Sequence, residues 1–192
     1  MPSLTFNTSK EGSIEATNAA FATARAASSG TFTVNSGTCL CSTGFTIDRY
    51  GADFNTATLG GGATITAATI QVYFVSTNAS NTDSSTFDIV GFTPADPANI
   101  VDGDYDQFGT TVFATKNLAD ITDAAYNTFT LDANGLANIS KTSYSSFGFR
   151  IGRDTVNSQP TGANRHDFHD RTNANPMILT VTYTTGGFLN LF

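Results

Sequence analysis

The stretch that decides the fold class is ATITAATIQVYFV, residues 63–75. Towards its end apolar and polar side chains alternate, so that Ile70, Val72 and Phe74 share one face of an extended chain. This period of two is typical of a half-buried β-strand. The three glycines at 60–62 indicate a turn at its entrance. Residues 63–75 are therefore predicted to form a strand.

Four further segments show the pattern of sheet strands bounded by turn residues. They are residues 87–92, 126–131, 147–151 and 177–184. In residues 147–151 both phenylalanines and the isoleucine are expected to face inward, with Arg150 outward. Residues 76–86 are mostly serine, threonine, asparagine and aspartate without periodicity, which predicts an exposed loop. Strands at this spacing, joined by polar loops, predict an all-β fold, an antiparallel β-sandwich.

Two segments have features of helices. Residues 132–141 begin with Asp132, a good capping residue, and place Leu136 and Ile139 three apart, which predicts one or two helical turns. Residues 18–27 are rich in alanine, but their apolar positions follow no period of 3.6, so their structure stays open here. We therefore expect one or two short helices beside the strands.

The composition supports the β assignment and limits the classes of function. Threonine and phenylalanine, with 32 and 16 residues, favour strands, whereas lysine and glutamate are scarce. The length of 192 residues predicts one domain, residues 1–185, followed by an apolar C-terminal segment, residues 186–192.

A net charge of −7 without a cluster of lysine or arginine argues against nucleic acid as a partner. No apolar run reaches the roughly 18 residues of a membrane span, and residues 1–6 lack the pattern of a signal peptide, so we expect neither a membrane partner nor export.

Several motifs follow one another in order between residues 22 and 183. They are ATARAASSG at 22–30, DRYGADFNTATL at 48–59 with GATITAATI at 62–70, FTLD at 129–132 with Gly135 and Ile139 after it, and NPMILTVTY at 175–183. Together they resemble the signature of the DNRLRE-type jelly-roll modules, which occur in bacterial surface proteins and in phage virion proteins. The resemblance implies a jelly-roll sandwich and no activity. Two positions depart from the family pattern, because Phe21 stands where tryptophan is common and Asn55 where aspartate is usual, which puts in doubt any bridge from position 55 to an arginine.

One acidic motif is a candidate metal site. Asp102, Asp104 and Asp106 occupy alternate positions, as in the oxygen-ligand loops that bind Ca²⁺. Gln107 stands where an EF-hand loop needs glycine after its third acid, so this is not an EF-hand. A calcium ion completed by backbone carbonyls or distant acids remains one interpretation. The other is that these carboxylates cap turns and helix starts in an acidic surface loop.

Two cysteines and two histidines make up the ligand types of a structural zinc site. However, one residue separates Cys39 from Cys41, fewer than zinc pairs normally have, and His166 and His169 are far away in the sequence. A strained disulfide is a second possibility. The third is that both cysteines are reduced, which agrees with assembly in a reducing cytoplasm.

The sequence offers little for catalysis, so we expect no enzyme. It has only two histidines, no Gly-x-Ser-x-Gly motif, no phosphate-binding glycine motif, and only two glutamates, Glu11 and Glu15. Carbohydrate binding is the most credible small-ligand function, because tyrosines on a sandwich surface can stack on sugars. The absence of tryptophan weakens it. The six tyrosines are Tyr50, Tyr73, Tyr105, Tyr126, Tyr144 and Tyr183.

The most informative local feature follows the last predicted strand. After Gly186 and Gly187, four large apolar side chains occur within five residues. They are Phe188, Leu189, Leu191 and Phe192. Such a segment is unusual on a solvated surface, so we expect it to dock on a partner or to add a strand to a neighbour's sheet. The alternative is that it folds back over its own sandwich.

These features predict a non-enzymatic structural protein of a phage virion, assembled in the host cytoplasm and exposed on the particle. Capsid decoration is the first choice, and a module of a fibre or tail is the next. The expected partners are other virion subunits, including copies of the chain in a homo-oligomer. The rival interpretation is a carbohydrate-binding module for host or matrix polysaccharide.

Overall fold

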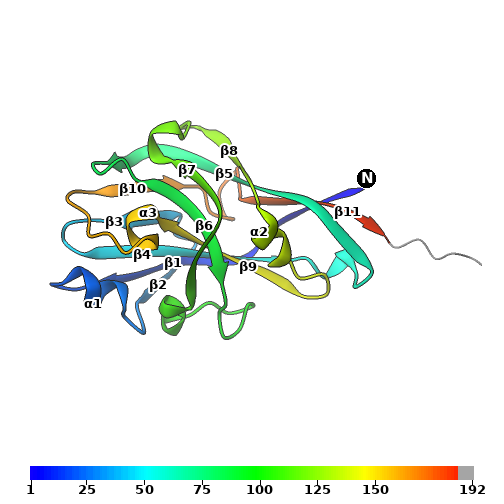
Figure 1. The fold of residues 1–192 in the computed structure, drawn as a ribbon, viewed down its shortest axis with the longest axis horizontal. Coiled ribbons are helices and arrows are strands. Elements are labelled where there is room, and N and C mark those ends of the chain that lie inside the picture. Colours follow the sequence, from blue (N-terminus) through cyan, green and yellow to red (C-terminus); the bar gives the residue numbers. More distant parts are fainter. Residues whose placement is uncertain (186–192) are drawn as a thin grey trace, which may run out of the picture.

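The computed structural model describes residues 1–185, except for the side chains of residues 76–78. Strands predominate in it (Figure 1). In chain order the elements are β1 (Ser3–Thr17), α1 (Phe21–Arg25), β2 (Thr31–Val34), β3 (Thr38–Cys41), β4 (Thr46–Asn55), η1 (Ala57–Leu59), β5 (Ala63–Asn81), β6 (Thr86–Phe92), η2 (Asp102–Gln107), β7 (Phe108–Asn117), η3 (Leu118–Asp120), β8 (Ala125–Thr130), α2 (Ala133–Ala137), β9 (Tyr144–Ile151), α3 (Gly152–Thr155), β10 (Asn164–Phe168) and β11 (Ile178–Thr185).

The prediction of an all-β protein is confirmed. The five predicted strands correspond to β5, β6, β8, β9 and β11, and α2 lies inside the predicted helical segment 132–141. The alanine-rich segment 18–27 contains one short helix, α1. None of the helices in residues 1–185 is long and apolar enough to cross a membrane.

Six strands form a hydrogen-bonded ring, in which every pairing is antiparallel. The order is β1, β11, β5, β10, β3 and β4, and β4 pairs again with β1. From β4 the sheet continues through β9, β6 and β7, while β8 flanks β5 and β2 flanks β1. The sheet therefore closes on itself like a barrel and carries a further arm of three strands.

The core lies where this arm packs against β5 and β8. Phe87 of β6 is fully buried, and its ring centroid is 5.0 Å from Phe74, 5.6 Å from Phe168, 5.8 Å from Phe129 and 5.9 Å from Phe149. Each fully buried phenylalanine contributes about 1.5–3 kcal/mol of transfer free energy. The alternating phenylalanines of the sequence thus form one aromatic cluster that joins β5, β6, β8, β9 and β10.

The predicted loop at residues 76–86 is wrong for its first half. Strand β5 continues to Asn81, and β10 pairs with it, Asn164 opposite Asn81 and Arg165 opposite Ser80. Backbone hydrogen bonds to a neighbouring strand hold this part of β5, and they need no apolar alternation in the sequence. The connection to β6 is limited to residues 82–85.

The predicted outward orientation of Arg150 is also wrong. Its side chain is only 2% exposed, although it lies in β9 between the inward-facing Phe149 and Ile151. Strand β9 is buried on both faces, because the second face is covered by residues that bind the guanidinium group. These partners are described below.

One end of the long axis is built by three strands. The start of β1, the end of β11 and the start of β5 lie side by side there (Figure 1), with Ser3 opposite Thr182 and Thr185 opposite Ala63. The described residues therefore stop at this end of the sheet, at Thr185.

Candidate functional site

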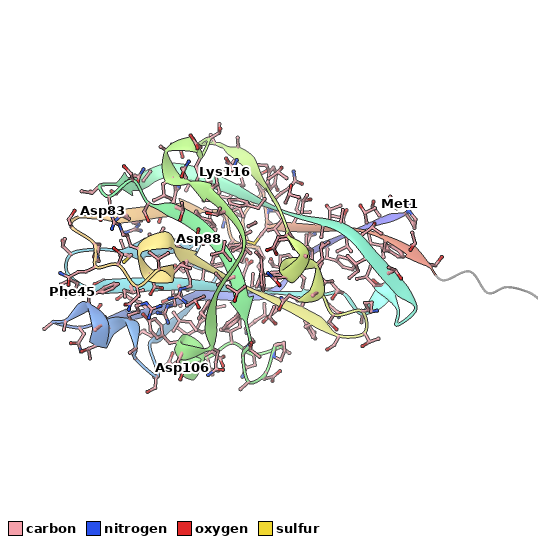
Figure 2. The ribbon with its side chains drawn as sticks, viewed as in Figure 1. Met1, Phe45, Asp83, Asp88, Asp106 and Lys116 are labelled. Atoms are coloured by element: carbon pink, nitrogen blue, oxygen red, sulfur yellow. The ribbon has the colours of Figure 1, made fainter. Side chains whose placement is uncertain are left out.

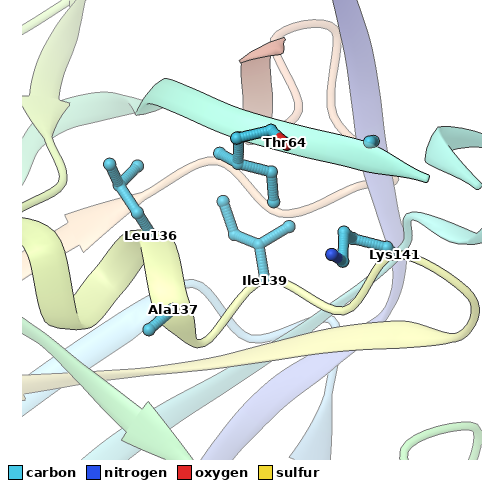
Figure 3. A pocket seen from close by; sticks show the side chains of 7 residues that line it. Thr64, Leu136, Ala137, Ile139 and Lys141 are labelled. Atoms are coloured by element: carbon cyan, nitrogen blue, oxygen red, sulfur yellow. The ribbon is translucent and has the colours of Figure 1, made fainter. Parts of the chain in front are cut away.

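An apolar groove of about 300 Å³ lies between the start of β5 and the end of α2 with the residues that follow it (Figure 3). Leu136 and Ile139 point towards β5 from one wall, and Ala63 and Ile65 belong to the other. The remaining lining residues are Thr64, Ala137 and Lys141. A groove of this size and polarity can take one or two apolar side chains.

Helix α2 is held in place by its cap and by one glycine. The Asp132 carboxylate accepts a hydrogen bond from the Gly135 amide at 2.8 Å, as a helix N-cap does. A Cβ at Gly135 would lie 2.9 Å from the Leu131 Cβ and 3.0 Å from the Phe113 Cβ, so only glycine lets the helix pack this closely. This packing fixes the position from which Leu136 reaches the groove.

The groove borders a strand edge that is paired on one side only. Strand β11 pairs with residues 63–71 of β5, whereas β8 pairs with the opposite edge only from Thr69 onward. In the described chain, residues 63–67 therefore present backbone N–H and C=O groups beside an apolar groove. This combination is typical of sites where an extended peptide adds a strand.

The residues predicted to dock, Phe188, Leu189, Leu191 and Phe192, lie outside the described residues. The point from which they extend is described. Thr185 ends β11 and pairs with Ala63, which lines the groove. The last described residue therefore lies one strand away from the groove.

The acidic motif forms η2, and its carboxylates have separate backbone or side-chain partners. Asp102 accepts a hydrogen bond from the Phe32 amide at 2.7 Å, and the buried Asp104 accepts from the Ala95 and Val101 amides at 3.1 and 2.9 Å. Asp106, at the lower edge of the molecule in Figure 2, accepts from its neighbour Gln107. Among the described residues, no three His, Cys, Asp or Glu side chains are grouped so as to hold a metal. The contact between Asp104 and Val101 is a cap at the start of η2, as the second interpretation expects, whereas Asp102 binds an amide of β2. Calcium stays a prediction.

The cysteines and histidines do meet, because Cys39 in β3 lies opposite His166 in β10. They are nevertheless engaged elsewhere. The Cys39 thiol donates to the Phe149 carbonyl at 3.3 Å, and His166 Nε2 lies 3.3 Å from an Asp123 oxygen. His169 stacks on Tyr73, with ring centroids 4.6 Å apart. Both cysteines are buried free thiols, so the disulfide alternative is wrong.

The most densely connected polar cluster joins three arginines to Asp154. Arg49 contacts both carboxylate oxygens, at 2.8 and 2.9 Å, and Arg150 contacts one of them at 2.8 Å. Arg25 reaches the Asp154 backbone carbonyl at 2.7 Å. The Arg49 guanidinium also lies 4.1 Å from the centre of the Tyr105 ring. The cluster therefore ties α1, β4, β9, α3 and η2 together.

Sequence analysis missed this cluster, although two signals for it were present. Arg25 lies in ATARAASSG and Arg49 in DRYGADFNTATL, two of the motifs described above, and Asp154 follows Arg150 by four residues. Burial alone would raise the pKa of Asp154, but Arg49 and Arg150 hold this pKa below its usual value. The carboxylate therefore stays charged inside the protein.

A second groove, of about 290 Å³, is polar. Its floor follows one cross-strand row, in which Thr31, Glu15, Asp48, Leu40 and Arg165 are successive partners. Asp48 is 7% exposed, one of its oxygens has no hydrogen-bond partner, and burial together with the charge of Glu15 raises its pKa to about 8. The other lining residues are Ser13, Thr33, Ser36 and Thr38. Hydroxyl and carboxyl groups thus dominate this surface.

The tyrosines divide into buried and half-buried ones. Tyr50 and Tyr105 are fully buried, so they offer no stacking surface to a sugar. Tyr73 and Tyr126 are half-buried and contact each other edge to face, with ring centroids 5.3 Å apart. Neither of them lines the polar groove.

A scan against protein-family models finds no match to this chain, and a search of curated proteins also finds none.

Proposed function

We propose that this protein is a non-enzymatic structural subunit of a phage virion surface, built as a jelly-roll sandwich, that assembles with other copies through residues 186–192. Capsid decoration is the preferred role, and a fibre or tail module is the next. The observation that carries the proposal is the position of Thr185. It ends β11 on the strand next to β5, whose other edge is half-paired and borders the apolar groove, and the apolar segment follows Thr185 in the sequence.

The energetics support a docking role for this segment. Burying four large apolar side chains gives about 6–12 kcal/mol, at 1.5–3 kcal/mol each, before the ordering of the segment is subtracted. The same side chains in water would form an apolar patch of the kind that marks interaction sites. A homo-oligomer is the simplest assembly that covers them.

The use of buried charge also supports a structural role. Arg49, Arg150 and Asp154 are at most 3% exposed and connect secondary-structure elements. They line neither of the two grooves described above. Their ion pairs and hydrogen bonds therefore stabilise the fold.

The test is the mass of the purified chain in solution, measured by size-exclusion chromatography with light scattering. We expect an oligomer, and we expect Phe188→Ser combined with Phe192→Ser to convert it to a folded monomer. A wild-type chain that stays monomeric at all accessible concentrations would contradict the proposal. Imaging of the particle that carries the protein then tests its location on the virion.

A carbohydrate-binding module is the second candidate, and the polar groove favours it. Adjacent carboxyl groups of Glu15 and Asp48, the Arg165 guanidinium and several hydroxyls can exchange hydrogen bonds with the hydroxyls of a sugar. Electrophoresis in gels that contain polysaccharide tests this function. Retardation that is lost in Asp48→Asn supports it, and equal mobility with and without polysaccharide contradicts it.

A further inference from the structure

We infer that the apolar groove between β5 and α2 receives residues 188–192 of a second copy of this chain, added as a strand along residues 63–67 of β5. This inference rests on the proposed function and names the surface that it requires. Two independent features meet at this place, the apolar walls and the half-paired edge.

The segment has the pattern that such a site selects. In an extended chain Phe188, Asn190 and Phe192 share one face, and Leu189 and Leu191 share the other. Either face presents two large apolar side chains, which matches a groove lined by Ile65, Leu136 and Ile139. Backbone hydrogen bonds to residues 63–67 would give affinity, and the groove would select the side chains.

The geometry favours the segment of a second copy over the segment of the same chain. Strand β11 and the groove lie on opposite edges of β5, so the same chain would have to cross β5. That crossing takes about 10 Å, two strand spacings, and the three steps from Thr185 to Phe188 reach only about 10–11 Å when fully extended. Phe188 therefore has no length left for a detour around residues 60–62, which lead into β5 at the same end, so the same chain could not pair with residues 63–67 from residue 188 onward.

A second copy meets no such obstacle. Thr185, which precedes the donor segment (residues 188–192) in the sequence, and the acceptor groove lie at the same end of the molecule. Two copies related by a twofold axis at this end can therefore exchange segments reciprocally. The exchange closes both edges and leaves no free donor.

The experiment separates donor from acceptor in the full-length chain. Phe188→Ser with Phe192→Ser removes the donor and leaves the groove intact. Leu136→Glu places a charge in the groove at a half-buried position of α2, where glutamate is a good helix former. Val156→Glu is the matched control, because Val156 is 69% exposed and lies away from the groove. Ile65→Glu is a second groove variant, and circular dichroism selects the variants that fold.

Sedimentation equilibrium should show dimers for wild type and for Val156→Glu. Each groove variant should raise the dissociation constant at least tenfold. The donor variant and a groove variant, each monomeric alone, should form a one-to-one complex when mixed, because one intact donor then meets one intact groove.

If the mixture stays monomeric, the inference is overturned. If the groove variants dimerise like wild type while the donor variant does not, the groove is wrong and the proposed function stands. A monomeric wild type overturns both.

Discussion

Asp154→Asn is the sharpest test of how this fold is held together. The substitution keeps the shape of the side chain and removes its charge. Asp154 is 1% exposed and accepts three charged hydrogen bonds, two from Arg49 and one from Arg150. Both guanidinium groups are at most 3% exposed, so without the carboxylate they are buried positive charges next to each other.

The expected loss of stability follows from that geometry. Removing one partner of a buried ion pair typically costs 3–5 kcal/mol, since an uncompensated charge remains. Two arginines lose their partner here, so we expect a loss near the upper value, about 5 kcal/mol. For a chain of this length that lowers Tm by about 10–20 °C. Urea unfolding followed by circular dichroism measures the free energy, and a thermal scan measures Tm.

The control is Asp106→Asn, which removes an exposed carboxylate whose hydrogen bond goes to the adjacent Gln107. This change should stay within about 0.5 kcal/mol of wild type. A loss below about 1 kcal/mol for Asp154→Asn would refute the reasoning, because it would mean that the arginines reach water or other partners without structural cost.

Three other changes test separate parts of the structure. Burial, with the charge of Glu15, raises the pKa of Asp48 to about 8. The neutral carboxyl group of Asp48 therefore stabilises the folded state fully below its unfolded pKa near 4, and this stabilisation is lost as pH rises through about 8. Asp48→Asn should therefore leave stability at pH 4 nearly unchanged and raise it at pH 8 by more than about 1 kcal/mol in urea titrations, and equal effects at both pH values would contradict this. In Gly37→Ala the new Cβ would lie 1.9 Å from the Phe168 carbonyl oxygen, so we expect a loss of about 1–3 kcal/mol in the same assay, and an unchanged midpoint would show that this strand end is looser than described. Both cysteines are buried, and burial raises the pKa of each thiol. Iodoacetamide should therefore alkylate them only in denaturant, which mass spectrometry measures. Rapid alkylation of the native protein would contradict the described burial.

The strands found from the sequence carry large apolar side chains at alternate positions, whether their second face is solvated, as in β11, or buried, as in β9. In β5 and β11 polar residues alternate with them because each strand has a solvated side. Strand β4 was missed because polar and apolar residues do not separate onto its two faces, since Asp48 and Arg49 are buried in it next to Tyr50. A buried arginine looks like a solvated one in a sequence, since its partner Asp154 lies more than a hundred residues away.

The site was only partly accessible to sequence analysis for a similar reason. The apolar segment 186–192 is local and could be recognised from composition. The groove is not local, because Ala63 and Ile65 are separated from Leu136 and Ile139 by some seventy residues. Only the pairing of β5 with β11 and the packing of α2 bring these parts to the same end of the molecule.

The free edges of three strands differ in which groups of the chain contact them. An unpaired edge invites uncontrolled pairing, and proteins usually cover it. In β2 the Phe32 amide is bound by the Asp102 side chain. In β7 the Phe113 carbonyl accepts a hydrogen bond from the Asp132 amide. Residues 63–67 of β5 have no comparable cover within the described chain, although they border an apolar groove. An unpaired strand edge that borders an apolar groove is suited to receive a partner strand, which is the role proposed for residues 63–67.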